Sequence, residues 1–284
     1  MKPLPITNKK RVGVCLSPAL INHFDLEDSI VVIIDVLRAT TTMCAAFDNG
    51  VRSIIPCLEK EIAREYQDKG FLVAGERNGI QIEGFDFGNS PYSFMRDDLA
   101  GRDLAMSTTN GTKALDAALE RNAKEIVVGA FANFNKLAQY LKQRNENVLL
   151  FCAAWKDRPN LEDTIFAGAM VRRLRGQFRL HEDTALMAEA LYRSANRRKR
   201  WYIRHSSHFN RLWHILQIQK DVKYALRRDT HPVIPVYAGD RLFKLSDLKS
   251  GKYDPIRVKQ ELDFLEKKAS VNIEKIPSQA KVPE

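Results

Sequence analysis

Residues 31–42 read VVIIDVLRATTT, and they join an almost wholly apolar run to a carboxylate, an arginine and three threonines. A run of this kind is typical of a strand that is buried on both faces of a parallel sheet. Asp35, Arg38 and Thr40–Thr42 then lie where the strand ends and a helix begins. The simplest interpretation is a solvated strand end with Thr40 as the helix cap. The alternative is that a metal and an anionic ligand meet there.

Further β-branched runs along the chain predict more strands, and helical patterns lie between many of them. The expected strands are 11–16, 30–36, 52–56, 71–74, 104–107, 125–129, 148–152 and 233–237. The expected helices are 41–48, 59–68, 113–121, 133–142, 161–174 and 182–194. This alternation predicts an α/β fold of three layers, in which helices cover both faces of a largely parallel or mixed sheet.

The chain of 284 residues suffices for one α/β unit over residues 1–245, and two lobes with a boundary near 150–180 are an option. A polar tail with one helix, Ile256–Leu265, is expected over 246–284. No apolar stretch reaches the roughly 20 residues that a membrane span needs. The first 18 residues lack a secretory apolar region, and the four cysteines have no CxxC spacing. We therefore expect a cytoplasmic protein with reduced, buried cysteines and no membrane partner, and a homo-oligomer is an option.

The net charge of +10 has one main source. Residues 172–228 hold 15 lysines and arginines against 4 acids, an excess of 11. The densest part, residues 193–204, also holds Trp201 and Tyr202. Basic residues beside aromatic ones can bind nucleic acid. Such runs are more often a solvated helix face, so a nucleic-acid partner is unlikely.

Ligands of such sheets bind beyond the carboxyl ends of the strands, and polar residues follow several of the expected strands. Glu76 and Arg77 lie in GERNG, where an ordinary turn with a surface ion pair is the alternative. Asp86 stands between two phenylalanines that should bury it, and a buried carboxylate needs a cation or strong hydrogen-bond donors. The alternative is that an internal arginine pairs with Asp86. Glu162 and Asp163 begin a helix, where acids often only complement the helix dipole.

Carboxylates without paired His or Cys favour a hard cation, Mg²⁺ first. The predicted metal ligands are Asp35, Glu76, Asp86, Glu162 and Asp163. Arginines, hydroxyls and backbone N–H groups would then hold a small phosphorylated anion. The candidates for that role are Arg38, Thr40, Thr41, Arg77, Asn89, Ser90 and the loop Thr108, Thr109, Asn110, Gly111 and Thr112, which lacks the Walker A spacing.

The ordered motifs DVLRATTT, GER-G, GFDFGNSP, TTNGTKAL and LEDTIFAG resemble the 2-phosphosulfolactate phosphatase family. The resemblance covers roughly residues 11–240, and His208, Asp221 and Asp229 stand at matching places. Phe209 and Gln217 stand where the pattern leads us to expect glycine. The resemblance implies a three-layer α/β fold and a Mg²⁺-dependent phosphatase. Its reaction gives 3-sulfolactate, a step toward coenzyme M.

Three residues carry the expected chemistry, namely Asp35, Arg38 and His208. His208 could protonate the leaving alkoxide, although a lone histidine is more often structural. Asp35 is either a metal ligand or a covalent nucleophile, and Leu37 stands where DxD-type phosphatases have their second Asp. One alternative is a phosphatase of another phosphorylated hydroxy acid. The other is a module that binds nucleic acid or an acidic partner through residues 193–204.

Overall fold

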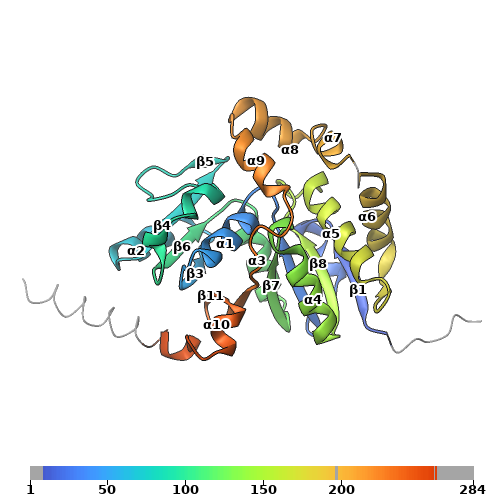
Figure 1. The fold of residues 1–284 in the computed structure, drawn as a ribbon, viewed down its shortest axis with the longest axis horizontal. Helices are drawn as coiled ribbons and strands as arrows, with labels where there is room; N and C mark the ends of the chain where they lie inside the picture. The colour runs from blue at the N-terminus through green and yellow to red at the C-terminus, as the bar shows by residue number, and fades with distance from the viewer. Residues whose placement is uncertain (1–8, 196–197, 259, 261–284) are drawn as a thin grey trace, which may run out of the picture.

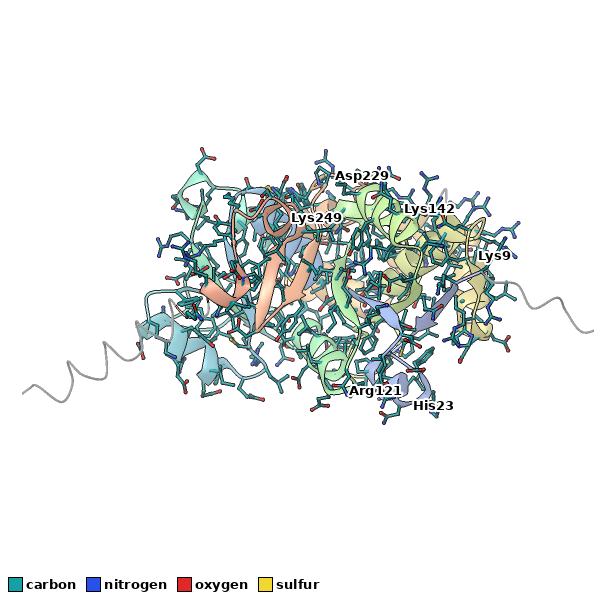
Figure 2. The ribbon with its side chains drawn as sticks, turned by 90° about the horizontal axis from the view of Figure 1, so that it is seen from below. Lys9, His23, Arg121, Lys142, Asp229 and Lys249 are labelled. Atoms are coloured by element: carbon teal, nitrogen blue, oxygen red, sulfur yellow. The ribbon has the colours of Figure 1, made fainter. Side chains whose placement is uncertain are left out.

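The computed structural model describes residues 9–195, 198–258 and 260. Helices cover both faces of a central mixed sheet, which confirms the three-layer α/β prediction (Figure 1). Figure 2 shows charged side chains such as Lys142, Asp229 and Lys249 around the outside of these layers. The four cysteines are buried and free, as expected. No helix among these residues has the length and apolar character that a membrane span requires.

The sheet consists of two parallel blocks that a C-terminal hairpin joins. The first block is β9 (Arg179–Leu180), β1 (Arg11–Cys15), β8 (Asn147–Cys152), β2 (Ser29–Ile34) and β7 (Glu125–Gly129). The second is β3 (Ser53–Pro56), β6 (Asp103–Ser107) and β4 (Leu72–Arg77), with short antiparallel β5 (Ile80–Gln81) at its edge.

The hairpin is β10 (Pro235–Ala238) and β11 (Arg241–Lys244), and both its strands pair antiparallel with their neighbours. Val236 of β10 pairs with Val127 of β7, and Leu242 of β11 pairs with Ile54 of β3. Three antiparallel steps separate β7 from β3, so the two blocks run in opposite directions along the sheet. The predicted strand 233–237 therefore does return to the sheet, but as an antiparallel bridge.

Side chains that alternate along the central strands build two cores, one on each face. Val12, Ile30 and Val32 pack toward α4 (Phe134–Arg144), α5 (Leu161–Leu174) and α6 (Glu182–Ala195). Val31 and Ile33 face α1 (Ala39–Asp48) and α3 (Gly111–Glu120), in a core that also takes in strands of the second block. A smaller core lies under α2 (Lys60–Asp68). The blocks are thus joined by packing as well as by the hairpin.

The chain after α6 forms short helices that lie over the loops at the top of Figure 1. They are α7 (Lys199–Ile203), α8 (Ser207–Asn210), a π-helical turn (Arg211–Ile215) and α9 (Gln219–Ala225). Short 3₁₀ turns occur at Pro18–His23, Pro91–Phe94, Asp97–Leu99 and Phe131–Asn133. The optional lobe boundary at 150–180 falls on β8, α5 and β9 of the first block. After α10 (Leu245–Lys249), most of the predicted helix Ile256–Leu265 lies outside the described residues.

Candidate active site

A small pocket opens where the loops after β2, β4, β6 and β8 meet α8 and the π-helical turn. Seven of the predicted site residues line it, namely Asp35, Arg38, Glu76, Asn89, Thr109, Asn110 and His208. The pocket therefore unites residues that lie up to 173 positions apart in the chain. Its location agrees with the rule that ligands bind beyond the strand ends.

Asp35 and Glu76 are the two acids of the pocket wall, and only 7 % of the surface of each is exposed. Burial raises the pKa of Asp35 to about 6, while the nearby His208 opposes that rise and the Glu76 carboxylate adds to it. The first residue of α3 comes close to it, since a Cβ built on Gly111 would lie 3.1 Å from Asp35 Oδ2. Glycine thus lets the N-terminus of α3 approach this carboxylate.

His208 is fixed from two sides. Its Nδ1 lies 2.6 Å from Oε1 of Glu162, a carboxylate in the first turn of α5 with no exposed surface. The Trp155 indole stacks on the imidazole with ring centroids 5.6 Å apart and planes 9° apart. Because Glu162 occupies Nδ1, only Nε2 is left to act in the pocket.

The turn after β8 brings Trp155 to the histidine at a cost in backbone strain. Ala154, Lys156 and Asp157 have φ angles of 61°, 53° and 61°, a left-handed conformation that side chains disfavour. Two backbone hydrogen bonds between Trp155 and Arg158 close the turn, and Lys113 forms an ion pair with Asp157. Strained backbone persists only where the surrounding structure holds it in place, and such positions concentrate at functional sites.

Three cationic side chains lie at the pocket, and the first, Arg38, is held by other residues of the protein. Arg38 Nη1 lies 2.6 Å from Asp221 Oδ2 of α9, and its Nη2 donates to the Gly79 carbonyl at 3.0 Å. Ser90 Oγ donates to the other oxygen of Asp221 at 3.0 Å. Arg38 therefore ties the loop after β2 to α9. Arg211 and the exposed Lys156 add positive charge beside the face of Trp155.

The oxygen atoms of the pocket suit a hard cation. Glu76 accepts hydrogen bonds from the Gly79 and Thr109 N–H groups at 2.5 and 2.8 Å, which fixes its carboxylate. Asn89 Oδ1 and Thr109 Oγ are buried and have no hydrogen-bond partner in the part of the chain that the structure describes. Mg²⁺ usually takes one or two carboxylates and completes its shell with water and substrate oxygens. Asp35, Glu76 and Asn89 fit that pattern, although no group of three or more His, Cys, Asp or Glu converges among the described residues.

Three predicted metal ligands lie elsewhere or are engaged otherwise, and the first is Glu162, which pairs with His208. Asp86 is exposed, so the expectation that its phenylalanine neighbours bury it is wrong; its carboxylate accepts from Val73 N–H at 2.8 Å. Asp163 is fully buried, and its oxygens accept from Val36 N–H and the Asn160 amide, both at 2.8 Å. Burial, with the charges of Asp35 and Glu162, raises the pKa of Asp163 well above its usual range.

Most of the predicted anion-binding hydroxyls are used within the fold. Thr40 Oγ accepts from Asp35 N–H, and the Thr41 hydroxyl donates to the Val36 carbonyl at 2.9 Å. In the loop after β6, Thr108 Oγ accepts from Thr112 N–H. Arg77 also stays outside the pocket, because it donates to Ser107 Oγ at 2.9 Å and to backbone carbonyls. These residues shape the loops around the pocket.

Sequence reasoning missed several residues of the pocket wall, namely Leu37, Asn78, Trp155, Lys156, Arg211 and Leu212. Trp155 and Lys156 directly follow β8, so the same strand-end rule could have found them. No local signal marks Arg211, because the course of the chain after α6 alone brings it to the strand ends.

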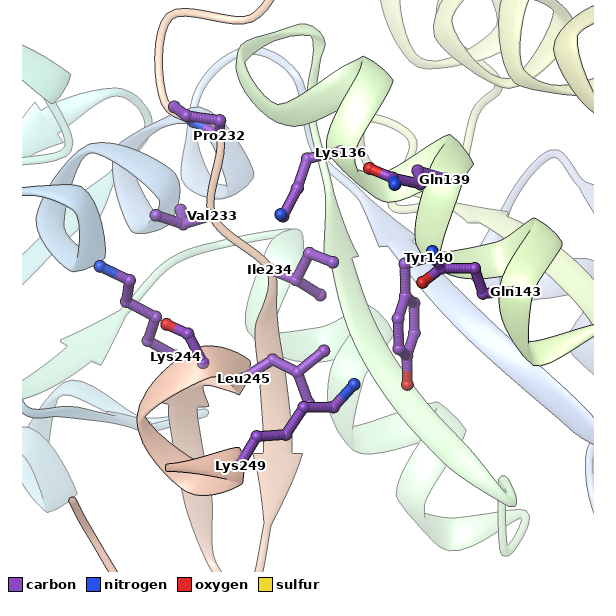
Figure 3. A pocket seen from close by; sticks show the side chains of 11 residues that line it. Lys136, Gln139, Tyr140, Gln143, Pro232, Val233, Ile234, Lys244, Leu245 and Lys249 are labelled. Atoms are coloured by element: carbon purple, nitrogen blue, oxygen red, sulfur yellow. The ribbon is translucent and has the colours of Figure 1, made fainter. Parts of the chain in front are cut away.

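A separate pocket between α4 and the β10–β11 hairpin is unlike this one. Figure 3 shows Lys136 of α4 and Lys249 of α10 at opposite ends of it, with apolar Ile234 and Leu245 between them. None of the predicted site residues and no carboxylate is among the described residues that line it. The pocket around Asp35 is therefore the candidate active site.

Comparisons with known proteins show the family of this chain. The profile of the 2-phosphosulpholactate phosphatase family matches residues 15–240, which include every residue of the pocket. A probable 2-phosphosulfolactate phosphatase of Thermotoga petrophila is 36% identical over 204 residues, 72% of this chain and 87% of the relative. Proteins with the same description from Caldicellulosiruptor saccharolyticus and Clostridium botulinum are 36% and 30% identical, over 72% and 83% of this chain and 87% and 100% of theirs. The chain therefore belongs to the 2-phosphosulpholactate phosphatase family.

Proposed function

We propose that this protein hydrolyses the phosphate ester of 2-phosphosulfolactate to 3-sulfolactate with the help of Mg²⁺. The observation that carries the proposal is the Glu162–His208 pair, held against Trp155 in the pocket that also contains Asp35 and Glu76. An acid that donates a proton beside two fixed carboxylates suits ester cleavage. The descriptions of the three relatives support the choice of substrate.

His208 acts on the leaving group in this mechanism. As the bond between phosphorus and the ester oxygen breaks, Nε2–H gives its proton to that oxygen. The fully buried Glu162 stabilises the imidazolium and orients the ring, in the manner of the carboxylate of a catalytic triad. Trp155 prevents rotation of the ring by stacking on its face.

Asp35 and Glu76 would hold Mg²⁺, with Asn89 Oδ1 as a third oxygen. Bound there, the cation would neutralise phosphate charge and orient the attacking water. Arg211 and Lys156 supply positive charge for the sulfonate and carboxylate of the substrate. Asp35 acts as a ligand and not as a nucleophile, since Leu37 replaces the second Asp of the DxD-type phosphatases.

The test is a comparison of substrates with and without EDTA. We expect Mg²⁺-dependent phosphate release from 2-phosphosulfolactate, and kcat/KM at least about tenfold lower for 2-phospholactate, which lacks the sulfonate. Arg211→Gln should reduce the difference in kcat/KM between the two substrates. Arg227→Gln, which changes an exposed arginine outside the pocket, should leave that difference unchanged. Equal rates on 2-phosphosulfolactate, 2-phospholactate and phosphoglycolate would show that the enzyme is not specific for 2-phosphosulfolactate.

The role of Asp35 has its own experiment. Rapid acid quench during turnover of ³²P-labelled substrate should yield no protein-bound phosphate, because water attacks directly. An acid-stable, hydroxylamine-sensitive label that is lost in Asp35→Asn would establish the covalent route instead.

A further inference from the structure

Another pocket, which differs from the one beside the β10–β11 hairpin, lies behind the segment that carries His208. We call it the second pocket. It has a volume of about 480 Å³, which is within the range of small-molecule sites. Buried Phe209, Val222 and Leu226 form its floor, and the half-buried Trp213 forms a wall. Phe209 and Trp213 stack with ring centroids 5.0 Å apart and planes 17° apart, so the wall is a rigid, flat aromatic surface.

The rim of this pocket is basic throughout. Arg204, His205, His214 and Lys223 stand around the opening and are all exposed. Lys223 Nζ lies 5.3 Å from the centroid of the Trp213 ring, which keeps one cation directly beside the aromatic wall. No Asp or Glu is among the described residues that line the pocket. Its field therefore attracts anions and selects against cations.

The same short elements face both pockets. Arg211 and Leu212 of the π-helical turn line the candidate active site, whereas the next residue, Trp213, lines the second pocket. In α9, Asp221 holds Arg38 of the active site, while Lys223 lies at the rim of the second pocket. The second pocket is thus separate from the first, and it uses Arg204 and Lys223 of the basic segment 172–228, which have no part in the proposed hydrolysis.

We propose that this second pocket binds a small organic anion with an aromatic body. The ring lies against Trp213 and over the apolar floor, and the anionic group meets Arg204 and Lys223 at the rim. An apolar floor without carboxylates does not suit the fully polar substrate of the first pocket. A flat apolar body explains the stacked wall, and a sulfonate or phosphate explains the rim.

The probe for the test is 8-anilinonaphthalene-1-sulfonate, an aromatic sulfonate that fluoresces when bound. We expect one site per chain. The double variant Arg204→Gln/Lys223→Gln should weaken binding roughly tenfold, because two rim charges are lost. The matched control is Lys220→Gln/Arg227→Gln, which removes the same charge from exposed residues that do not line the pocket. N-phenyl-1-naphthylamine, the same rings without the sulfonate, should bind the wild type and the rim variant equally.

The side chains substituted in the rim and control variants are exposed, so these variants should fold, and circular dichroism checks this. Arg211→Gln, which removes a charge from the first pocket only, should leave the affinity for the probe unchanged. A loss of affinity in Arg211→Gln as large as that in the rim variant would put the probe in the first pocket and overturn the proposal. Equal affinity of the rim and control variants would overturn it as well. Neither result depends on phosphatase activity, so the proposed function could fail while this site stands.

Discussion

Asp35 shows most clearly how a single residue can weaken the fold while it serves the site. Its carboxylate is buried beside Glu76 and near Glu162, and only hydrogen bonds and His208 offset the cost of its charge. A charged group in such surroundings opposes folding. Natural enzymes accept this loss where chemistry needs the group.

Asp35→Asn should therefore stabilise the metal-free protein while it abolishes turnover. A folded-state pKa of about 6, above the usual value of 3.8, means that protonated Asp35 contributes stability below pH 4. That contribution is lost as the pH rises through about 6. In EDTA, we expect the variant to gain at most about 3 kcal/mol at pH 7 and almost nothing at pH 4. Urea unfolding at both pH values measures this; equal gains at both would contradict the assignment.

Glu162 should act through His208. A comparison of two esters with different leaving groups tests this role. Glu162→Gln and His208→Asn should each lower kcat for 2-phosphosulfolactate by about 100-fold, since the alkoxide needs a proton. For 4-nitrophenyl phosphate, whose leaving group needs none, the loss should stay below about tenfold. The double variant should be little worse than either single one. Equal losses on both esters would indicate a structural role only.

At the scale of elements, α5 combines two tasks. Its first turn supplies Glu162 and Asp163, and its middle packs against α6 at Gly168. A Cβ on Gly168 would lie 1.9 Å from the Ala188 carbonyl oxygen, so the two helices touch through their backbones there. This contact holds the helix that carries Glu162 in position.

Gly168→Ala should consequently destabilise the protein by about 3 kcal/mol or more, because α5 and α6 must separate. Gly176→Ala is the control, as nothing lies within 4 Å of a Cβ there and its φ is not in the left-handed range. Thermal unfolding should give a change below about 0.5 kcal/mol for the control. Similar melting temperatures for both variants would disprove the close packing.

The turn between the π-helical segment and α9 gives a physical reason to expect glycine at position 217. Gln217 stands where we expected glycine, and its φ is 54°, a left-handed value that glycine adopts without strain. Gln217→Gly should stabilise the protein by about 1 kcal/mol, in contrast to most glycine substitutions. Gln219→Gly, in the first turn of α9, should destabilise it in the same urea titration.

For the whole molecule, the net charge of +10 is a long-range property. A positive protein attracts a substrate that carries phosphate, sulfonate and carboxylate before any contact forms. We expect kcat/KM to fall about three- to tenfold between about 20 and 200 mM NaCl, with kcat nearly constant. Salt screens the long-range attraction that brings the substrate to the protein, whereas the reaction of the bound substrate is not affected. A constant kcat/KM over that range would show that the charge plays no part in capture.

Local patterns determined the elements of this protein. Apolar β-branched runs and helical periodicity predicted β7 and α5 with their observed bounds, because burial of alternate side chains or of one stripe dictates these structures. The same patterns missed β5, β9 and β11, which have two to four residues. Strands this short carry little periodic signal, and β9 and β11 also pair with strands far along the chain, β1 and β3. Strand ends also predicted Asp35, Glu76, Asn89 and Thr109 as pocket residues.

Only the tertiary structure decided how these residues are used. The two sheet blocks run in opposite directions, so sequence order could not show that the loops after β2 and β4 meet. The fold gives Glu162 to His208 and Arg38 to Asp221, whereas Asp86 stays exposed at a strand edge. The physical reason is that a sequence sets which groups need burial or partners, while chain packing sets which partners come within hydrogen-bonding distance.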